Sequence, residues 1–212
     1  VIQAVKENTA LDFPVSFRMN GDEYVEGGIK LEEAKEMAKR FIDAGVHVLH
    51  VSAGVYGSPA PNVPVMGTPP APLLHLAEGI KSVSSVPVIA AAKIHQPDLA
   101  DSIIKEGKAG FVSIGRGLIC DPEWTKKAQE GKVDDIRGCI TCNQGCIDRL
   151  LAEAGSVSCI YNARAGRELQ FPMTEVEAKK KVVIIGGGPA GMEAARTAVL
   201  RGHTVHLFEE AG

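Results

Sequence analysis

The sequence lacks several features that would place a protein in a broad class at once. No apolar run approaches the roughly 20 residues that a membrane-spanning helix needs, and no segment resembles a signal peptide. Aromatic residues make up only 5% of the chain, which argues against a surface that stacks single-stranded nucleic acid. A net charge of −3 indicates no polyanionic partner. We therefore expect neither a membrane nor a nucleic acid as partner.

Residues 1–130 alternate apolar strands with amphipathic helices. We expect strands at 13–18, 46–53, 86–92 and 110–115, and helices at 31–44, 72–84, 97–106 and 122–130. Four such βα units suit a doubly wound sheet or half of a (β/α)8 barrel. The barrel is favoured, because polar residues fall at the C-terminal strand ends, where barrels place their active sites. These residues are Arg18, Ser52, Lys93 and Arg116.

Four of the five cysteines are clustered in the pattern C-x2-C-x3-C-x12-C. They are Cys139, Cys142, Cys146 and Cys159. Thiolates at this spacing suit one soft metal centre, and the spacing alone leaves zinc and a [4Fe–4S] cluster both open. So many thiols indicate a reducing compartment, which we take to be the cytoplasm. Cys120 stands apart and is expected to be a small buried hydrophobe.

A second signature is the glycine-rich run Gly186-Gly-Gly-Pro-Ala-Gly191. An apolar strand at 182–185 precedes it, and a helix at 189–201 and a strand at 204–208 follow. In this setting G-x-G-x-x-G indicates the start of a Rossmann-like βαβ nucleotide-binding domain. A nucleotide loop after a thiolate site suggests electron transfer, and this favours the iron–sulfur cluster over zinc.

Each glycine of the run has an expected purpose. Gly186 permits the tight turn, Gly188 the close approach of a pyrophosphate, and Gly191 the packing of helix on strand. Glu209 lies 23 residues after Gly186 and would accept hydrogen bonds from a ribose, with Glu210 as the adjacent alternative.

Two arginines carry further chemistry. Gly115 and Arg116 follow the last expected strand, and their backbone N–H groups with the guanidinium suit a phosphate monoester. A surface arginine beside a glycine turn is the alternative. Arg18 ends an apolar strand and either faces a flavin pyrimidine edge or forms a structural ion pair. Lys93 likewise either contacts a flavin or forms a structural ion pair.

The order of these motifs resembles the iron–sulfur flavoenzymes related to old yellow enzyme. This group includes the 2,4-dienoyl-CoA reductase, 2-enoate reductase and trimethylamine dehydrogenase types. The resemblance rests on Ser-Ile-Gly-Arg, then Cys-Ile-x-Cys-Asn-Gln-x-Cys, then Gly-Gly-Gly-Pro-Ala-Gly, and it covers essentially the whole chain. It implies the C-terminal half of an FMN-binding TIM barrel over 1–136, a [4Fe–4S] segment and linker over 137–181, and a truncated FAD/NAD(P)-binding domain over 182–212.

The resemblance also implies roles for individual residues. The four clustered cysteines match the cluster ligands, and Gly115 with Arg116 matches the FMN-phosphate motif. Ala92 matches a backbone contact to that phosphate, and Arg18 matches the arginine beside the flavin N1/O2 edge, where it would stabilise a reduced, anionic flavin. The glycine run and Glu209 match the FAD or ADP site.

The chain departs from the family pattern at the proton donor. The family's catalytic tyrosine lies upstream of Val1, and a histidine that some dienoyl-CoA reductases carry is replaced. Its counterpart is Tyr56, which either donates a proton and orients substrate or is a loop aromatic with no chemical role.

These expectations combine into an NAD(P)H-dependent ene reductase. Electrons would pass from NAD(P)H to FAD, the cluster, FMN and finally an activated C=C bond of a small enoate or enoyl thioester. The alternatives are an amine dehydrogenase that passes electrons to a carrier protein, and an inactive fragment. The start at Val1 and the stop at Gly212 suggest a chain cut at both ends. The substrate, the choice of NADH or NADPH, and whether the protein is a homo-oligomer stay open.

Overall fold

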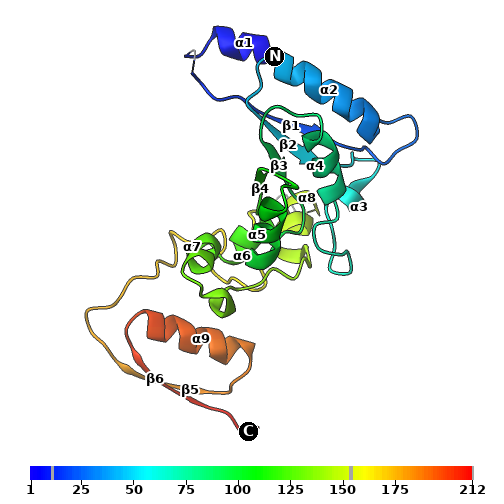
Figure 1. Ribbon diagram of the computed structural model, residues 1–212. Coiled ribbons are helices and arrows are strands. Elements are labelled where there is room, and N and C mark those ends of the chain that lie inside the picture. Colours follow the sequence, from blue (N-terminus) through cyan, green and yellow to red (C-terminus); the bar gives the residue numbers. More distant parts are fainter. Residues whose placement is uncertain (11, 153–154, 212) are drawn as a thin grey trace. The chain divides into compact units, whose positions relative to one another are not determined.

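The structure is a computed structural model that describes residues 1–10, 12–152 and 155–211 (Figure 1). The chain divides into two compact units, Val1–Ala163 and Arg164–Gly212, and each is described by itself. Among the described residues, no helix combines the length and apolar character that a bilayer crossing would need.

A parallel four-stranded sheet is the centre of the first unit, in the order β1-β2-β3-β4. The strands are β1 (Ser16–Asn20), β2 (Val48–Ser52), β3 (Val88–Ala90) and β4 (Phe111–Val112). Ser16 lies opposite Val48, and Ile89 lies opposite Phe111. Because all four strands run the same way, their carboxyl ends meet at one edge of the sheet.

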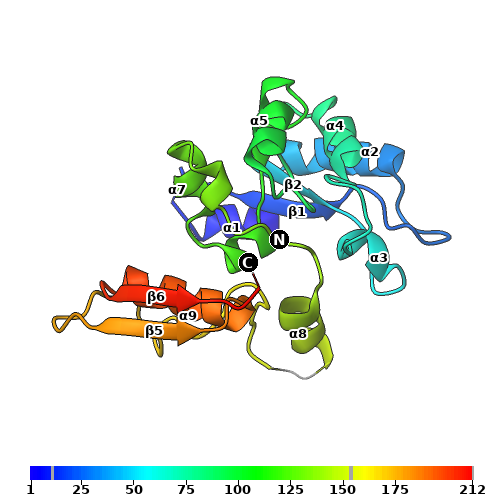
Figure 2. The same cartoon turned by 90° about the horizontal axis from the view of Figure 1, so that it is seen from below.

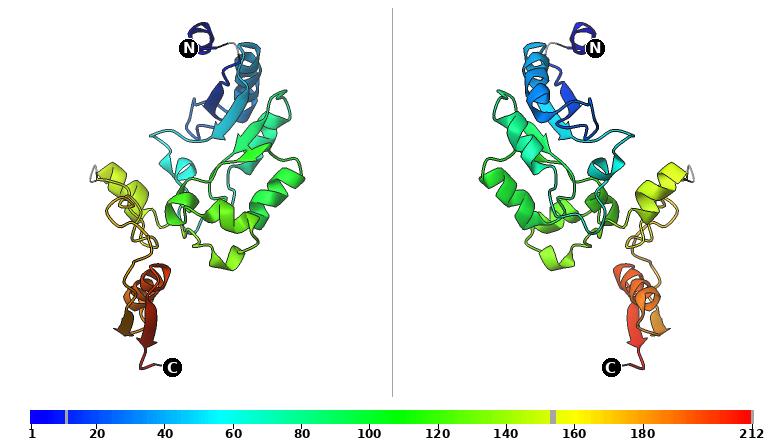
Figure 3. Two further views of the ribbon diagram at one scale, coloured as in Figure 1. Left: turned by 90° about the vertical axis from the view of Figure 1, so that its left-hand side faces the viewer. Right: turned by 90° about the vertical axis from the view of Figure 1, so that its right-hand side faces the viewer.

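Three helices cross over between these strands and cover one face of the sheet (Figures 2 and 3). They are α2 (Leu31–Asp43), α4 (Leu74–Lys81) and α5 (Pro97–Lys105). Ala34 of α2 and Ile80 of α4 are fully buried, as are Leu49 and Val88 of the strands. The apolar periodicity of each helix therefore faces the sheet, as the sequence predicts.

The remaining helices of the first unit are short. They are α1 (Ile2–Glu7), α3 (Pro59–Asn62), α6 (Arg116–Cys120), α7 (Trp124–Gln129), the 3-10 turn η1 (Val133–Asp135), the π-helical turn η2 (Gln144–Asp148) and α8 (Arg149–Ala152). The helix predicted at 122–130 is α7. No helix was predicted at α6, where Gly117 breaks the helical sequence pattern.

The strands are shorter than predicted, above all β4, which has two residues. The residues after the ladder still have their backbone hydrogen bonds, since the Ser113 amide donates to Ala90 O at 2.8 Å. The apolar run thus continues past the regular strand, and sequence periodicity cannot locate where pairing stops.

The second unit consists of β5 (Lys181–Ile185), α9 (Pro189–Leu200) and β6 (Thr204–Phe208) (Figure 3). The two strands are parallel and pair from Lys181 opposite Thr204 to Ile185 opposite Phe208. Residues 164–180 contain no helix or strand. The division of the chain into 1–136, 137–181 and 182–212 stays a prediction.

Candidate functional site

A cavity of about 170 Å3 lies where the carboxyl ends of the strands meet; we call it the strand-end cavity. Its lining includes Arg18, Ala92, Lys93, His95, Gly115 and Arg116. The four residues predicted for the FMN site are therefore brought together from segments almost a hundred residues apart. Parallel pairing of the strands is what places them at one edge.

Arg18 projects from β1 among neutral neighbours. Its Nη2 donates to Ser52 Oγ at 2.9 Å, and Nη1 lies 3.5 Å from His50 Nε2. Burial and the Arg18 charge lower the pKa of His50, which keeps that ring neutral near pH 7. No described carboxylate forms an ion pair with Arg18, so its positive charge is available for an anionic ligand.

The backbone leaves β3 through two left-handed residues, Ala92 with φ 79° and Lys93 with φ 51°. Neither is glycine, and such conformations are costly unless the surroundings impose them. The Lys93 ammonium donates to three loop carbonyls, those of Val65 at 3.0 Å, Met66 at 2.7 Å and Thr68. Lys93 therefore fastens the 65–68 loop beside the cavity.

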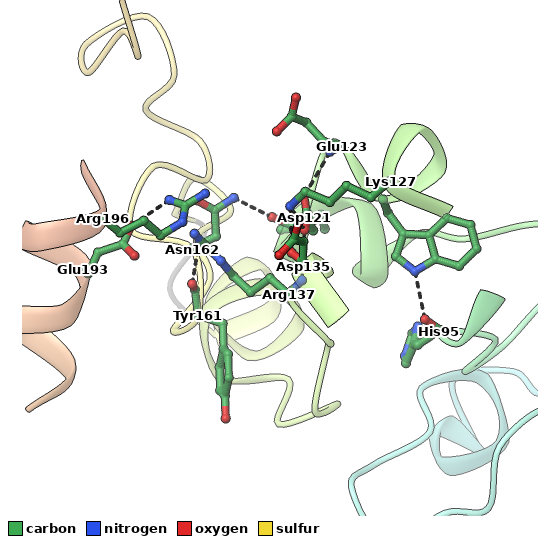
Figure 4. A network of polar contacts seen from close by, with 12 residues as sticks. His95, Asp121, Glu123, Lys127, Asp135, Arg137, Tyr161, Asn162, Glu193 and Arg196 are labelled. Carbon is green, nitrogen blue, oxygen red and sulfur yellow. Dashed lines mark hydrogen bonds and ion pairs between the residues drawn. The ribbon is translucent and has the colours of Figure 1, made fainter. Parts of the chain in front are cut away.

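His95 is a member of the cavity lining that the sequence did not indicate. Both of its ring nitrogens are buried without a hydrogen-bond partner. Desolvation, with Arg116 and Lys93 nearby, lowers its pKa to about 4. The His95 carbonyl accepts a hydrogen bond from the Trp124 indole N–H at 2.8 Å, which holds the His95 backbone in place (Figure 4). A neutral ring with unused polar atoms is a ready ligand contact.

All five cysteines line a second space, which we call the cysteine pocket. They are Cys120, Cys139, Cys142, Cys146 and Cys159, and their thiols are free. Within the described residues no three His, Cys, Asp or Glu side chains are already arranged around a metal position. The pocket therefore gathers the predicted thiolate donors without a closed coordination shell.

The loop between the first cysteines has an unusual backbone. Thr141 and Asn143 are both buried and left-handed, with φ of 56° and 64°. The Thr141 amide donates to Cys139 Sγ at 3.4 Å. Burial, opposed by this N–H, raises the pKa of Cys139, and burial beside Cys159 raises the pKa of Cys120 to about 12. A soft metal would deprotonate thiols that otherwise stay protonated here.

Cys159 is held near the other thiols by a close backbone contact between its neighbour Ser158 and Gly145. The Ser158 amide donates to Gly145 O at 2.7 Å, and a Cβ on Gly145 would lie 2.8 Å from Ser158 O. Only glycine fits that approach. The distant fourth cysteine of the pattern is thus held against the turn that carries Cys146.

A buried carboxylate fastens the segment that leads to the cysteines (Figure 4). Asp121 accepts from Lys127 Nζ at 2.6 Å, from the Arg137 amide at 2.9 Å and from the Glu123 amide at 3.1 Å. Burial opposes its ionisation, but these donors hold the pKa of Asp121 below its usual value. The chain two residues before Cys139 is therefore anchored to α7.

Two positions of the glycine run in the second unit require glycine for structural reasons. Gly186 has φ 100°, and a Cβ on Gly191 would lie 1.9 Å from Gly186 O. Gly188 caps α9 and a Cβ there would meet no protein atom within 4 Å. The Glu209 carboxylate accepts from the Gly187 amide, and its pKa is lowered by this bond and by the Ala211 amide. Space is therefore kept open at Gly188 beside a carboxylate.

Tyr56 lies in the loop after β2 and is fully exposed. It is not among the residues that line the strand-end cavity. Its role as proton donor stays a prediction.

Comparison with known proteins assigns the chain to a family. Residues 1–135 match the NADH:flavin oxidoreductase / NADH oxidase family, and residues 180–212 match the pyridine nucleotide-disulphide oxidoreductases. The chain belongs to the NADH:flavin oxidoreductase / NADH oxidase family. The resemblance to flavoenzymes related to old yellow enzyme is thereby confirmed.

Relatives of this chain include reductases and oxidases. The chain is 49% identical to an NADH oxidase of Thermoanaerobacter brockii, over 99% of this chain and 32% of the relative. It is 37% identical to a cinnamate reductase of Clostridium sporogenes, over 100% of this chain and 34% of the relative. The chain therefore spans about a third of the length of these relatives.

Two solved structures match almost the whole length of this chain. A 2-naphthoyl-CoA reductase complex matches with a TM-score of 0.90 and 32% identity, over 97% of this chain and 32% of that one. Histamine dehydrogenase from Rhizobium sp. 4-9 matches with a TM-score of 0.84 and 27% identity, over 98% and 30%. Both reductases and amine dehydrogenases are thus among the proteins that this chain is similar to.

Proposed function

We propose that the whole protein is an NAD(P)H-dependent ene reductase of the enoate or dienoyl-CoA type. Electrons would travel from NAD(P)H through FAD and a [4Fe–4S] cluster to FMN, and then to an activated C=C bond. Bound flavins supply hydride chemistry, and the cluster supplies the single-electron steps between them. The observation that carries this proposal is the strand-end cavity, which unites Arg18, Ala92, Gly115 and Arg116 in one chain of the family.

The fold proposal is that residues 1–136 form the C-terminal half of a (β/α)8 barrel and that 182–212 begin a Rossmann-like domain. Two observations support it. The four parallel strands run in sequential order with their crossover helices on one face, as in a barrel wall. The unit β5-α9-β6 has parallel strands and the glycine run at the helix start.

Within the strand-end cavity, the residues present suit a flavin mononucleotide. The Arg116 guanidinium and the backbone at Gly115 and Ala92 would hold the phosphate. Arg18, without an ion-pair partner among the described residues, would place positive charge where a reduced flavin carries negative charge. A neutral His95 would offer a further hydrogen bond from the cavity wall.

The cysteine pocket suits a cluster held by Cys139, Cys142, Cys146 and Cys159. Free thiols of the right type surround one space, and the Thr141 N–H already points at a predicted ligand sulfur. Amide hydrogen bonds to ligand sulfurs are a recognised means of tuning such centres. In the second unit, Gly188 and Glu209 would take the pyrophosphate and ribose of FAD.

The relay is tested in the full-length protein with Cys142→Ser. Loss of the cluster should abolish NAD(P)H-driven substrate reduction while FMN is still reduced by dithionite. The matched control is Cys120→Ser, which changes a cysteine of the same pocket that is not a predicted ligand and should retain the iron. Full NAD(P)H-driven turnover in Cys142→Ser protein without iron would contradict the relay.

A second candidate is an amine dehydrogenase that passes electrons to a carrier protein. The likeness to a histamine dehydrogenase supports it. The two functions differ in the donor, so we would mix the full-length protein anaerobically with NADH, NADPH or small amines and follow the flavin absorption. Bleaching by an amine and by neither nucleotide would favour the dehydrogenase.

A further inference from the structure

Arg116 belongs to both spaces of the first unit. It lines the strand-end cavity together with Gly115, and it also lines the cysteine pocket together with Cys139. Its position at the start of α6 explains this, because the short helix runs from the cavity to Cys120 in the pocket.

The Arg116 guanidinium uses one nitrogen for contacts with the protein and leaves the other two for a ligand. Nη1 donates to Pro64 O at 2.8 Å and to Asn143 Oδ1. Within the part of the chain that the structure describes, Nε and Nη2 have no protein partner. One edge of the fork therefore holds the cysteine loop, and the rest is available to an anion in the strand-end cavity.

Asn143 passes the contact on to the cysteines. It is only 7% exposed and lies between Cys142 and Cys146, in the left-handed conformation that asparagine tolerates better than most residues. Its carbonyl accepts the amides of Cys146 at 3.3 Å and Asp148 at 3.0 Å. The side chain thus holds Arg116 while the main chain holds the turn that carries a predicted ligand.

We propose that the Arg116–Asn143 hydrogen bond couples phosphate binding in the strand-end cavity to metal retention in the cysteine pocket. Asn143 is then a positioning residue for both sites. A phosphate that fixes Arg116 also fixes Asn143, so the loop loses less freedom when metal binds. Thermodynamic linkage requires the effect to be reciprocal, and typical coupling between two sites is roughly 5- to 150-fold in affinity. The inference rests on the proposed function.

The test uses full-length protein, either loaded with iron and sulfide or stripped by a chelator. FMN affinity is measured by fluorescence quenching in both states, and iron release to a chelator is timed with and without FMN. In the unaltered protein we expect FMN to bind at least roughly fivefold more tightly to the loaded form and to slow iron release.

Three variants separate the hydrogen bond from the fold. Asn143→Gly removes the amide and keeps the left-handed backbone, so both ligands should still bind while the affinity ratio falls towards one. Asn143→Asp keeps an acceptor for Arg116 and should preserve the ratio. Asn162→Ala removes another buried asparagine side chain, which donates to Ile119 O at 2.9 Å, and should also preserve it.

The outcomes are distinct. An unchanged ratio in Asn143→Gly overturns the coupling. If that variant holds no metal, its FMN affinity should fall below that of stripped unaltered protein, because Arg116 has lost the side chain that positions it, and an equal affinity overturns the proposal. Full-length protein without iron and flavin would instead refute the proposed function. Protein with both, but equal FMN affinity in its two states, would refute only the coupling.

Discussion

His95 shows how a single buried ring can make stability depend on pH. Its pKa of about 4 in the folded chain lies below the ordinary value of 6.5, because burial and the charges of Arg116 and Lys93 disfavour the protonated ring. The unfolded chain therefore takes up a proton first as the pH falls. The stabilisation is complete above pH 6.5 and is lost between about 6.5 and 4.

We predict that His95→Gln removes most of this pH dependence. The unaltered protein without flavin should lose about 1 to 2 kcal/mol of unfolding free energy between pH 7 and pH 4 through this ring, less than the full shift implies because solvent screens a partly exposed group. Urea unfolding at several pH values measures it. Equal pH slopes in the two proteins would contradict the assignment. Phosphate bound in the strand-end cavity should weaken the effect, since a nearby anion favours the protonated ring.

The predictability of single residues depends on how local their signal is. Arg116 could be found because a glycine-rich turn follows a strand, and the clustered cysteines because their spacing is short. His95 and Asn143 could not, since their importance comes from burial and from partners many residues away. Spacing says which atoms are available, but only packing says which lack a partner.

At the scale of elements, the glycine run between β5 and α9 contains one glycine that the fold requires, Gly191, and one that we expect a ligand to require, Gly188. We predict that Gly191→Ala unfolds or distorts the second unit, because its Cβ would lie 1.9 Å from Gly186 O. Gly188→Ala should leave the fold intact, since nothing lies within 4 Å, but should weaken binding of ADP-containing nucleotides that need that space.

Circular dichroism and ADP binding on the two glycine variants of the full-length protein check this prediction. Gly188→Ala serves as the matched control, since it adds the same methyl group three residues away. Equal losses of structure in both variants would show that the contact with Gly186 is not what requires glycine. Unchanged ADP binding in Gly188→Ala would argue against a pyrophosphate at that position.

Asp121 connects α7 to the segment before Cys139, so we expect its substitution to destabilise more of the first unit than α7 alone. We predict that Asp121→Asn costs about 3 kcal/mol, because it leaves Lys127, itself mostly buried, without its carboxylate. The control is Asp101→Asn, which removes an exposed partner of Lys105 and should change stability by less than about 1 kcal/mol. Thermal unfolding of both variants decides, and equal losses would mean that burial of the pair is unimportant.

Element boundaries were predicted less well than element types. The strand at 204–208 was predicted correctly because Gly202 and Glu209 bound it clearly. The strand predicted at 110–115 is only Phe111–Val112, and α6 begins at residue 116 without a polar N-cap. Apolar sequence continues smoothly through that transition, so only the geometry of neighbouring strands fixes it.

At the scale of the whole molecule, sequential βα order predicts a parallel sheet, and the structure has one. The order also brings the strand ends together, which is why the strand-end cavity could be anticipated from four separate positions. The division into two units at Ala163 could not be predicted from the sequence, because no glycine- or proline-rich linker marks it. It follows from how contacts are distributed, which sequence composition does not record.

The division predicts where a protease cuts first. Residues 164–180 hold no helix or strand, and Arg167 and Lys179 are exposed there. Limited trypsin digestion should therefore cut at these residues before it cuts after Lys39, which is also exposed but lies within α2. Mass spectrometry of early fragments should show a piece of the chain that ends at Arg167 and contains all of the first unit. Early cleavage within α2 would instead mean that this helix opens as readily as the irregular segment, and that the first unit is less stable than its buried core of Leu49, Ile80 and Val88 implies.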